Sequence, residues 1–136
     1  MCNHPIVSII DDDESVRIAT SSLVRSLGWN VRLYESAEHF LQCGPVCDLT
    51  CIISDVRMPG LSGVEMYREL CGRGARPPII FISAFASEKV RRQAFDAGAA
   101  CVLSKPVDAA DVMRCLESVR TRADGVSSGR PPAASR

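Results

Sequence analysis

The sequence lacks an excess of charge of either sign. Its 136 residues include 16 Lys and Arg and 16 Asp and Glu, so the formal net charge is zero at pH 7. Proteins that bind nucleic acids or anionic lipids usually present a strongly basic surface. We therefore expect no direct contact between this chain and nucleic acid, and a DNA-binding function would need a domain outside it.

A long apolar run is missing too. No stretch approaches the roughly 20 apolar residues that a membrane-spanning helix requires, and the N-terminus has no basic segment followed by an apolar core, as a signal peptide would. These absences predict a protein that makes no membrane contact and stays in the cytoplasm.

Two common kinds of ligand site are also absent. The seven cysteines include no pair of CxxC units and no histidine at zinc-ligand spacing, which argues against a zinc site. No glycine-rich loop follows the first apolar segment, which argues against a nucleotide-binding α/β protein. The thiols are expected to be reduced and to fill apolar space in the interior.

The sequence does contain a regular alternation of two kinds of apolar segment. Short continuous runs indicate parallel strands covered on both faces, at residues 6–10, 31–34, 51–54, 79–82 and 101–103. Apolar residues at helical spacing lie between them, near residues 16–27, 36–41, 64–70, 90–97 and 112–119. The inward stripe of the first helix is expected to be Val16, Ala19, Leu23 and Leu27. Five strands alternating with five helices predict an α/β fold with a doubly wound, five-stranded parallel sheet.

The length of the chain fits one domain. We expect this domain to span residues 1–122, because the last apolar segment ends shortly before that point. Residues 123–136 are rich in Ser, Pro, Gly and Ala and have no apolar period, so they are expected to form a disordered tail or a linker.

Chemically active side chains follow four of the five predicted strands. Asp11 and Asp12 end the first, Asp55 ends the third, and Ser83 and Lys105 follow the last two. In a doubly wound sheet these carboxyl ends converge on one crevice. Three carboxylates suit Mg²⁺, a hydroxyl and an ammonium can hold phosphoryl oxygens, and an aspartate can become an acyl phosphate.

These residues lie in segments that resemble the receiver domain of two-component response regulators. The matching segments span roughly residues 5–121; they are the apolar run into DDDE, IISDVRMPGLSG, PIIFISAF and AGAACVLSKP. The similarity is greatest to receivers that precede a helix-turn-helix output domain in transcription regulators. It implies the flavodoxin-like receiver fold and a phosphorylation switch, not an enzyme that acts on outside substrates.

The resemblance also implies a role for each site residue. Asp55 would be the phosphoacceptor, and Mg²⁺ or Mn²⁺ would be held by Asp11, Asp12, Asp55 and the backbone carbonyl of Arg57. Ser83 and Lys105 would bind the phosphoryl group, and the Lys105–Pro106 peptide would be cis. A sensor histidine kinase would be the phosphoryl donor. The fourth helix, the last strand and the last helix would form a possible dimer surface.

The sequence departs from the receiver pattern at Val102. Receivers usually carry an aromatic residue there, three positions before the conserved lysine, and a valine cannot sweep out the same volume. We therefore expect the switch to work through a shift of the loop at Ser83, Ala84 and Phe85 and of the helix that follows it.

Two alternatives remain open from the sequence. A pseudo-receiver would keep the fold and bind partners without phosphate, and the valine at position 102 favours this interpretation. A haloacid-dehalogenase-type phosphatase would use Asp11 in a DxD motif as its nucleophile, but it would leave Asp55 and the RMPGLSG loop unexplained and the chain has no room for the usual cap.

Overall fold

The computed structural model describes residues 5–44 and 48–124, except the side chains of residues 120–124. Strands and helices alternate in this order: β1 (Ile6–Ile10), α1 (Glu14–Ser26), β2 (Asn30–Tyr34), α2 (Ala37–Cys43), β3 (Cys51–Asp55), α3 (Gly63–Gly72), β4 (Ile79–Ser83), α4 (Glu88–Ala97), β5 (Cys101–Ser104) and α5 (Ala109–Asp124). The predicted succession of five strands and five helices is confirmed.

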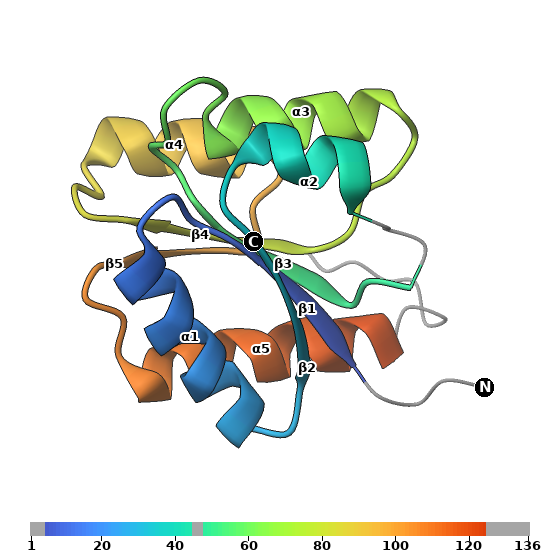
Figure 1. Ribbon diagram of the computed structural model, residues 1–136, viewed down its shortest axis with the longest axis vertical. Helices are drawn as coiled ribbons and strands as arrows, with labels where there is room; N and C mark the ends of the chain where they lie inside the picture. Colours follow the sequence, from blue (N-terminus) through green and yellow to red (C-terminus); the bar gives the residue numbers. More distant parts are fainter. Residues whose placement is uncertain (1–4, 45–47, 125–136) are drawn as a thin grey trace.

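The strands form one parallel sheet with the order β2-β1-β3-β4-β5. Figure 1 shows α1 and α5 on one face and α2, α3 and α4 on the other. The order reverses at β1, whose neighbours are β2 on one side and β3 on the other. The carboxyl ends of β1 and β3 are therefore adjacent, which is the arrangement that places a ligand site at this edge of the sheet.

The sheet is apolar on both faces because helices cover both. Every residue of β1, β3 and β4 is buried. Alternate side chains enter two core clusters: one, under α1 and α5, contains Ile9, Ile53 and Ile80, and the other, under α2, α3 and α4, contains Ile10 and Phe81. This two-sided burial explains why these strands read as continuous apolar runs.

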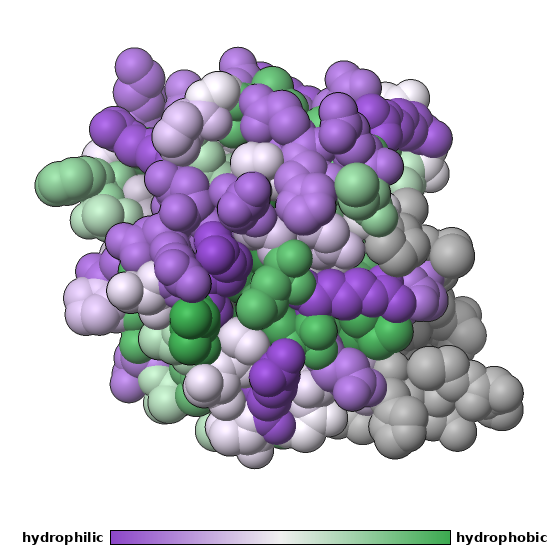
Figure 2. Space-filling view, viewed as in Figure 1, coloured by the Kyte–Doolittle hydropathy of each residue, from purple (hydrophilic) through white to green (hydrophobic). Residues whose placement is uncertain are grey.

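The edge strand β2 is only partly buried, and it lies behind the middle of the face that Figure 2 shows, as its place in Figure 1 indicates. Hydrophobic residues gather there near the middle of the view, while the surface over α2, α3 and α4 is mostly hydrophilic. Leu33 of β2 is 37% exposed. Only one side of this strand pairs with a neighbour, so its weaker apolar run in the sequence matches its position.

The ends of the helices follow local capping rules. Asp13, Ser36, Ser62 and Ser87 are the N-caps of α1, α2, α3 and α4, and each side chain accepts a backbone N–H three residues later. Gly98 ends α4 with φ of 114°, a left-handed conformation that glycine adopts without strain. These caps fix where each helix starts relative to the strand before it.

The expected inward face of α1 was wrong in part. The buried residues are Thr20, Ser21 and Val24. Ala19 is exposed, and Val16, Leu23 and Leu27 are only half-buried. Small hydroxyl side chains let this helix lie close to the sheet, so the buried face is not its most apolar face and hydropathy alone places it incorrectly.

The last helix runs to Asp124, two residues beyond the expected domain end at residue 122. The rest of the expected tail, from residue 125 onward, lies outside the described residues. No helix within residues 5–44 and 48–124 is long and apolar enough to cross a membrane.

Gly63, the first residue of α3, should tolerate no side chain. A Cβ there would collide with the carbonyl oxygen of Asp55 and lie 2.9 Å from Ser54 Oγ. We expect Gly63→Ala to lower the free energy of unfolding by about 2 kcal/mol, because overpacking forces the backbone apart. Urea denaturation measures this change.

Gly72, at the other end of the same helix, is the matched control. A Cβ there meets nothing within 4 Å, so Gly72→Ala should be neutral or stabilise by up to about 1 kcal/mol. Equal destabilisation by both variants would contradict the packing at Gly63.

Candidate functional site

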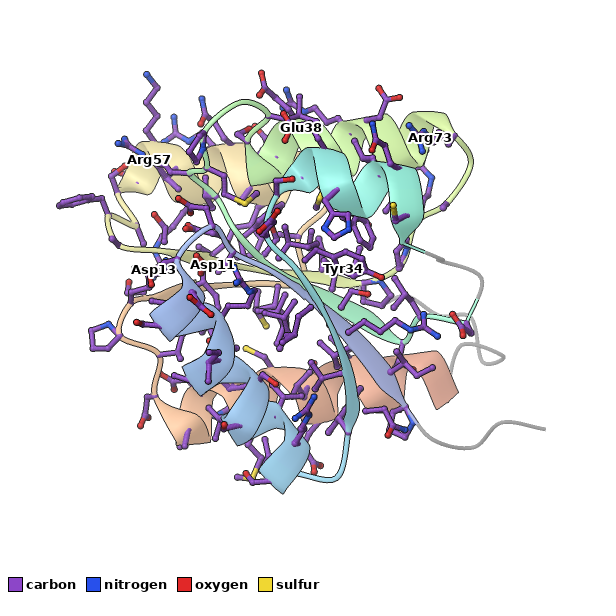
Figure 3. The ribbon with its side chains drawn as sticks, viewed as in Figure 1. Asp11, Asp13, Tyr34, Glu38, Arg57 and Arg73 are labelled. Carbon is purple, nitrogen blue, oxygen red and sulfur yellow. The ribbon has the colours of Figure 1, made fainter. Side chains whose placement is uncertain are left out.

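Three carboxylates meet where β1 and β3 end. One oxygen each from Asp11, Asp12 and Asp55 lie within 4.8 Å of one another. Asp11 is 3% exposed and Asp55 is 6% exposed, whereas Asp12 faces solvent. Figure 3 shows Asp11 where β1 turns into α1. The sequence-predicted acidic site is thus assembled, with two members inside the protein and one at its mouth.

The turn after β1 holds Asp11 in a fixed orientation. Its N–H donates to the carbonyl of Tyr34 at 3.2 Å, and its carboxylate oxygen Oδ1 accepts the N–H of Asp13 at 2.9 Å. The Arg17 guanidinium donates to the Asp11 carbonyl at 2.7 Å. Asp13 itself caps α1 through the Val16 N–H, so it serves the helix and not the carboxylate cluster.

Asp55 is fixed by the sheet and by the loop that follows it. The next residue, Val56, donates its N–H to the Ile82 carbonyl of β4 at 2.9 Å. The N–H of Arg57 donates to Asp55 Oδ1 at 3.3 Å. The Arg57 side chain is exposed and lies on the same side of the molecule as Asp11 (Figure 3).

Lys105 brings its ammonium between the two buried carboxylates. Its Nζ lies 3.0 Å from Asp55 Oδ2 and 3.2 Å from Asp11 Oδ2, and its side chain is 18% exposed. The Lys105 N–H donates to the Ser83 carbonyl at 2.9 Å, which joins the ends of β4 and β5. The Lys105–Pro106 peptide is cis, as the resemblance implied.

One ammonium does not neutralise this site. Burial raises the pKa of Asp55, and the charge of Asp11 raises it further, so that the hydrogen bond and charge of Lys105 do not bring it back to its usual value. Burial acts to lower the pKa of Lys105, but the hydrogen bonds and charges of Asp55 and Asp11 outweigh it and the pKa is raised. Three carboxylates and one ammonium leave negative groups in excess at this site.

The donor set fits a hard divalent cation. Carboxylate oxygens at close spacing are the ligands that Mg²⁺ prefers, and Mg²⁺ keeps several waters, which the exposed position of Asp12 permits. A cation would also offset the excess of carboxylates over ammonium groups at this site. The residues that could hold it are Asp11, Asp12 and Asp55.

The hydroxyl of Ser83 lies at the end of β4, one strand away from Asp55. Ser83 is 1% exposed, and its Oγ accepts the N–H of Phe85 at 3.1 Å. Ala84 is exposed, and Phe85 is 71% exposed. Ser83 is therefore tied to a segment whose other side chains contact little else.

Val102 is buried at the position where receivers usually have an aromatic residue. It is 5% exposed and packs in the cluster that contains Val90 and Ala94 of α4. The Arg91 guanidinium of α4 donates to its carbonyl at 3.4 Å. The edge strand β5 is thus joined to α4 through both the side chain and the backbone of Val102.

Two side chains that support the site were not predicted from the sequence. Arg17 contacts the Asp11 carbonyl from the first turns of α1, and Glu38 of α2 accepts the Leu61 N–H in the loop after Asp55. Both are charged residues on helix surfaces, which a sequence reader assigns to solvent. Arg17 follows the helix cap Asp13 by four residues, and that spacing is the only signal that could have indicated it.

The model of the response regulator receiver domain family matches residues 7–117. The chain belongs to this family. The receiver is 38% identical over 112 residues to the transcriptional regulatory protein FixJ of Azorhizobium caulinodans, and 37% identical over 116 residues to the transcriptional regulatory protein TdiR of Thauera aromatica. These alignments cover 82% and 85% of the chain.

The fold of the receiver is that of solved relatives. The crystal structure of FixJ-N superimposes with a TM-score of 0.78 at 29% identity, and the match covers 89% of this chain and 96% of that one. The chain spans about half the length of the curated relatives it matches, 53% of FixJ and 51% of TdiR. The alignment therefore covers only about half of each relative, and the functions of the remaining half lie outside the aligned residues.

Replacing Asp55 should stabilise the metal-free receiver. Because the Asp55 pKa is raised on folding, the folded protein holds this proton to a higher pH than the unfolded chain does. The contribution of Asp55 to stability is then present at low pH and is lost as pH rises through the folded-state pKa. In Asp55→Asn we expect this loss to vanish and the free energy of unfolding at pH 7.5 to increase by roughly 1 kcal/mol.

Denaturation in a chelator at several pH values measures both effects. Asp111→Asn is the control, since Asp111 forms only an exposed ion pair with Arg114 on α5 and should change stability by less than about 0.5 kcal/mol. A destabilised Asp55→Asn would show that Lys105 outweighs burial and Asp11.

Proposed function

We propose that this receiver takes a phosphoryl group from a sensor histidine kinase onto Asp55. The observation that carries the proposal is the position of Lys105 Nζ, 3.0 Å from Asp55 and 3.2 Å from Asp11, beside three carboxylates whose oxygens converge. Such a site has a nucleophile, a cation-binding set and a fixed positive charge at one place. These are the parts that phosphoryl transfer needs.

The nucleophile would be a carboxylate oxygen of Asp55. It attacks the phosphorus of a phosphorylated histidine, the new O–P bond forms, and the N–P bond breaks so that the imidazole leaves with the electron pair and takes up a proton. Bound Mg²⁺ or Mn²⁺ would neutralise charge on the phosphoryl oxygens. Asp11, Asp12, Asp55 and the Arg57 carbonyl would hold that ion.

Lys105 and Ser83 would then bind the phosphoryl oxygens. The Lys105 ammonium already contacts Asp55 Oδ2, so it needs to move little to reach an oxygen attached to that atom. Ser83 would donate its hydroxyl hydrogen and exchange its present contact with the Phe85 N–H for one that draws the Ser83–Phe85 segment toward the site.

The output would pass through this segment to α4. Val102 is too small to fill the volume of an aromatic ring and is already packed against α4, so the loop shift takes over the role of a ring rotation. The surface of α4, β5 and α5 would change and could form a homodimer. The residues through Asp124, the end of α5, would be the signalling unit. Residues 125–136 would lead to a DNA-binding output domain, since the relatives are transcriptional regulatory proteins about twice as long.

A pseudo-receiver that binds partners without phosphate is the second candidate, favoured by the buried Val102. A dehalogenase-type phosphatase would use Asp11 as nucleophile. In the structure the Asp11 carboxylate accepts the Asp13 N–H and contacts Lys105. Both alternatives make different predictions for aspartate variants.

Acetyl phosphate with Mg²⁺ should add one phosphoryl group to the wild-type receiver and none to Asp55→Asn, as measured by intact mass. Chelation of the metal should abolish the adduct. Asp13→Asn is the matched control, because asparagine also caps helices and Asp13 lies outside the cation-binding cluster; its adduct should match that of the wild type.

Each alternative has its own signature in this experiment. An adduct on Asp55→Asn that disappears in Asp11→Asn would indicate the phosphatase nucleophile. Absence of an adduct on the wild type, with both acetyl phosphate and a kinase tested, would favour the pseudo-receiver.

Ser83 should couple phosphorylation to the output surface. We expect phosphorylation to shift the backbone amide resonances of residues 83–85 and of α4 in the wild type. In Ser83→Ala the adduct should still form, while these shifts should fall by more than half, because the hydroxyl that follows the phosphoryl group is gone. Undiminished shifts in α4 would contradict a coupling through the Ser83 hydroxyl. Ser87→Ala, which removes only the α4 N-cap, is the control for loosening of that helix alone.

A further inference from the structure

The loop between β3 and α3, residues 56–62, contains the Arg57 backbone that lies next to Asp55. Its two ends are fixed. Val56 donates to Ile82 of β4, and Gly63 donates to the Val56 carbonyl, both at 2.9 Å. At the α3 end, Ser62 and Glu65 form a reciprocal capping box. The tip between these ends needs its own support if the Arg57 carbonyl is to keep one orientation.

Glu38 of α2 supplies a contact at this tip. Its carboxylate oxygen Oε2 accepts the Leu61 N–H at 2.9 Å. The same oxygen would lie 2.5 Å from a Cβ at Gly60, whose φ is +80°. The carboxylate therefore lies directly on the glycine turn, in space that any other residue at position 60 would fill. Figure 3 labels Glu38 on α2, the helix beside α3.

This contact differs from the other supports of the loop. Met58 is buried in the core and Leu61 packs against it, so apolar contacts hold the inner side of the loop. The Asp55 carboxylate accepts the Arg57 N–H at the start of the loop. Among the side chains of residues 5–44 and 48–119, Glu38 is the only one outside the loop that hydrogen-bonds to its tip, residues 58–61. The Leu61 hydrogen bond also lowers the pKa of Glu38, as expected for a carboxylate that accepts a backbone N–H.

We propose that Glu38 is a positioning residue for cation binding: by accepting the Leu61 N–H it fixes the loop whose Arg57 carbonyl completes the ligand set of Asp11, Asp12 and Asp55. The inference rests on the proposed function, from which the Arg57 carbonyl takes its role. Glu38 touches neither the cation nor the phosphoryl group. Its effect passes through the backbone from Leu61 to Arg57, four residues away.

The expected loss of cation affinity depends on how many of the cation ligands belong to the loop. Asp11 and Asp55 lie at strand ends and keep their positions without Glu38, so the loss falls on one ligand. Replacing partners that orient metal ligands typically costs 10–100-fold in affinity. Glu38 is exposed, so we expect a smaller loss, about three- to tenfold.

Four variants separate the position of the acceptor from its charge. Glu38→Ala removes both, and Glu38→Asp keeps the charge on a side chain one methylene too short to reach Leu61. Glu38→Gln keeps a carbonyl acceptor at the original length but removes the charge. Glu88→Ala removes the equivalent first-turn glutamate of α4, which pairs only with exposed Arg92, and controls for the helix dipole.

The first measurement uses the metal-free receiver and reads the Leu61 amide by NMR hydrogen exchange. Exchange should quicken at least threefold in Glu38→Ala and Glu38→Asp, stay close to the wild-type rate in Glu38→Gln, and be unchanged in Glu88→Ala. Equal rates in all five proteins would show that the contact does not hold the loop, and would overturn the inference at its first step.

The second measurement titrates Mg²⁺ into each protein by calorimetry, without any phosphoryl donor. The dissociation constant should rise about three- to tenfold in Glu38→Ala and Glu38→Asp and less than twofold in Glu38→Gln and Glu88→Ala. Wild-type affinity in Glu38→Asp together with a loss in Glu38→Gln would mean that Glu38 acts by charge alone, which overturns the proposal.

The two measurements keep this inference apart from the proposed function. Mg²⁺ affinity that depends on Glu38, in a receiver that takes up no phosphoryl group, would support the positioning role and reject the phosphoacceptor role. Phosphorylation of Asp55 with Mg²⁺ affinity indifferent to Glu38 would do the reverse. Should Glu38→Ala lose its fold, Glu38→Asp carries the same expectation with the charge retained.

Discussion

The rest of this structure depends on the crowding of carboxylates at the ends of β1 and β3. Two of them, Asp11 and Asp55, are buried, and like charges in such a place repel strongly. Lys105 lies within 3.2 Å of both, yet the Asp55 pKa stays raised. With three carboxylates and one ammonium, the site has fewer positive than negative groups, and a bound cation would offset the difference. In the proposed mechanism, a phosphoryl group would enter this site together with that cation.

Rigid surroundings keep this unfavourable arrangement in place. Asp55 is the last residue of the fully buried strand β3, which pairs with β1 on one side and β4 on the other. The backbone carbonyl of Asp55 lies so close to Gly63 that no side chain fits at position 63. Asp11 is held by backbone contacts to β2 and by Arg17. The strand ends cannot move apart, so the two carboxylates stay close together. A bound cation would relieve their repulsion. The loops beside them are less constrained, which is why contacts such as that of Glu38 can change affinity without changing the fold.

The sequence could predict the parts of this arrangement that depend on strand ends. Apolar runs locate the five strands, and side chains directly after parallel strands must meet at one edge, so Asp11, Asp12, Asp55 and Lys105 could be placed together. It could not predict contacts that depend on loop paths. Glu38 reaches Leu61 over a separation of 23 residues, and no periodicity records that distance. It also misplaced the buried face of α1, because small polar residues such as Thr20 can face a sheet when close approach matters more than hydropathy.

Val102 bears on how a change at the carboxylate site would reach the surface of α4. An aromatic residue there would offer the protein two ring positions, one inside and one outside; a valine that is 5% exposed and packed against α4 offers one. A hundredfold change in the population of an active state needs only about 2.7 kcal/mol. In the proposed mechanism Ser83 would form a charge-assisted hydrogen bond to a phosphoryl oxygen, and bonds of this type contribute about 1.5–3 kcal/mol. Such a bond at the Ser83–Phe85 segment would be sufficient on that scale. With Phe85 already 71% exposed, moving this segment would disrupt little packing, and in the proposed mechanism the free energy of the new bond would be available to displace α4.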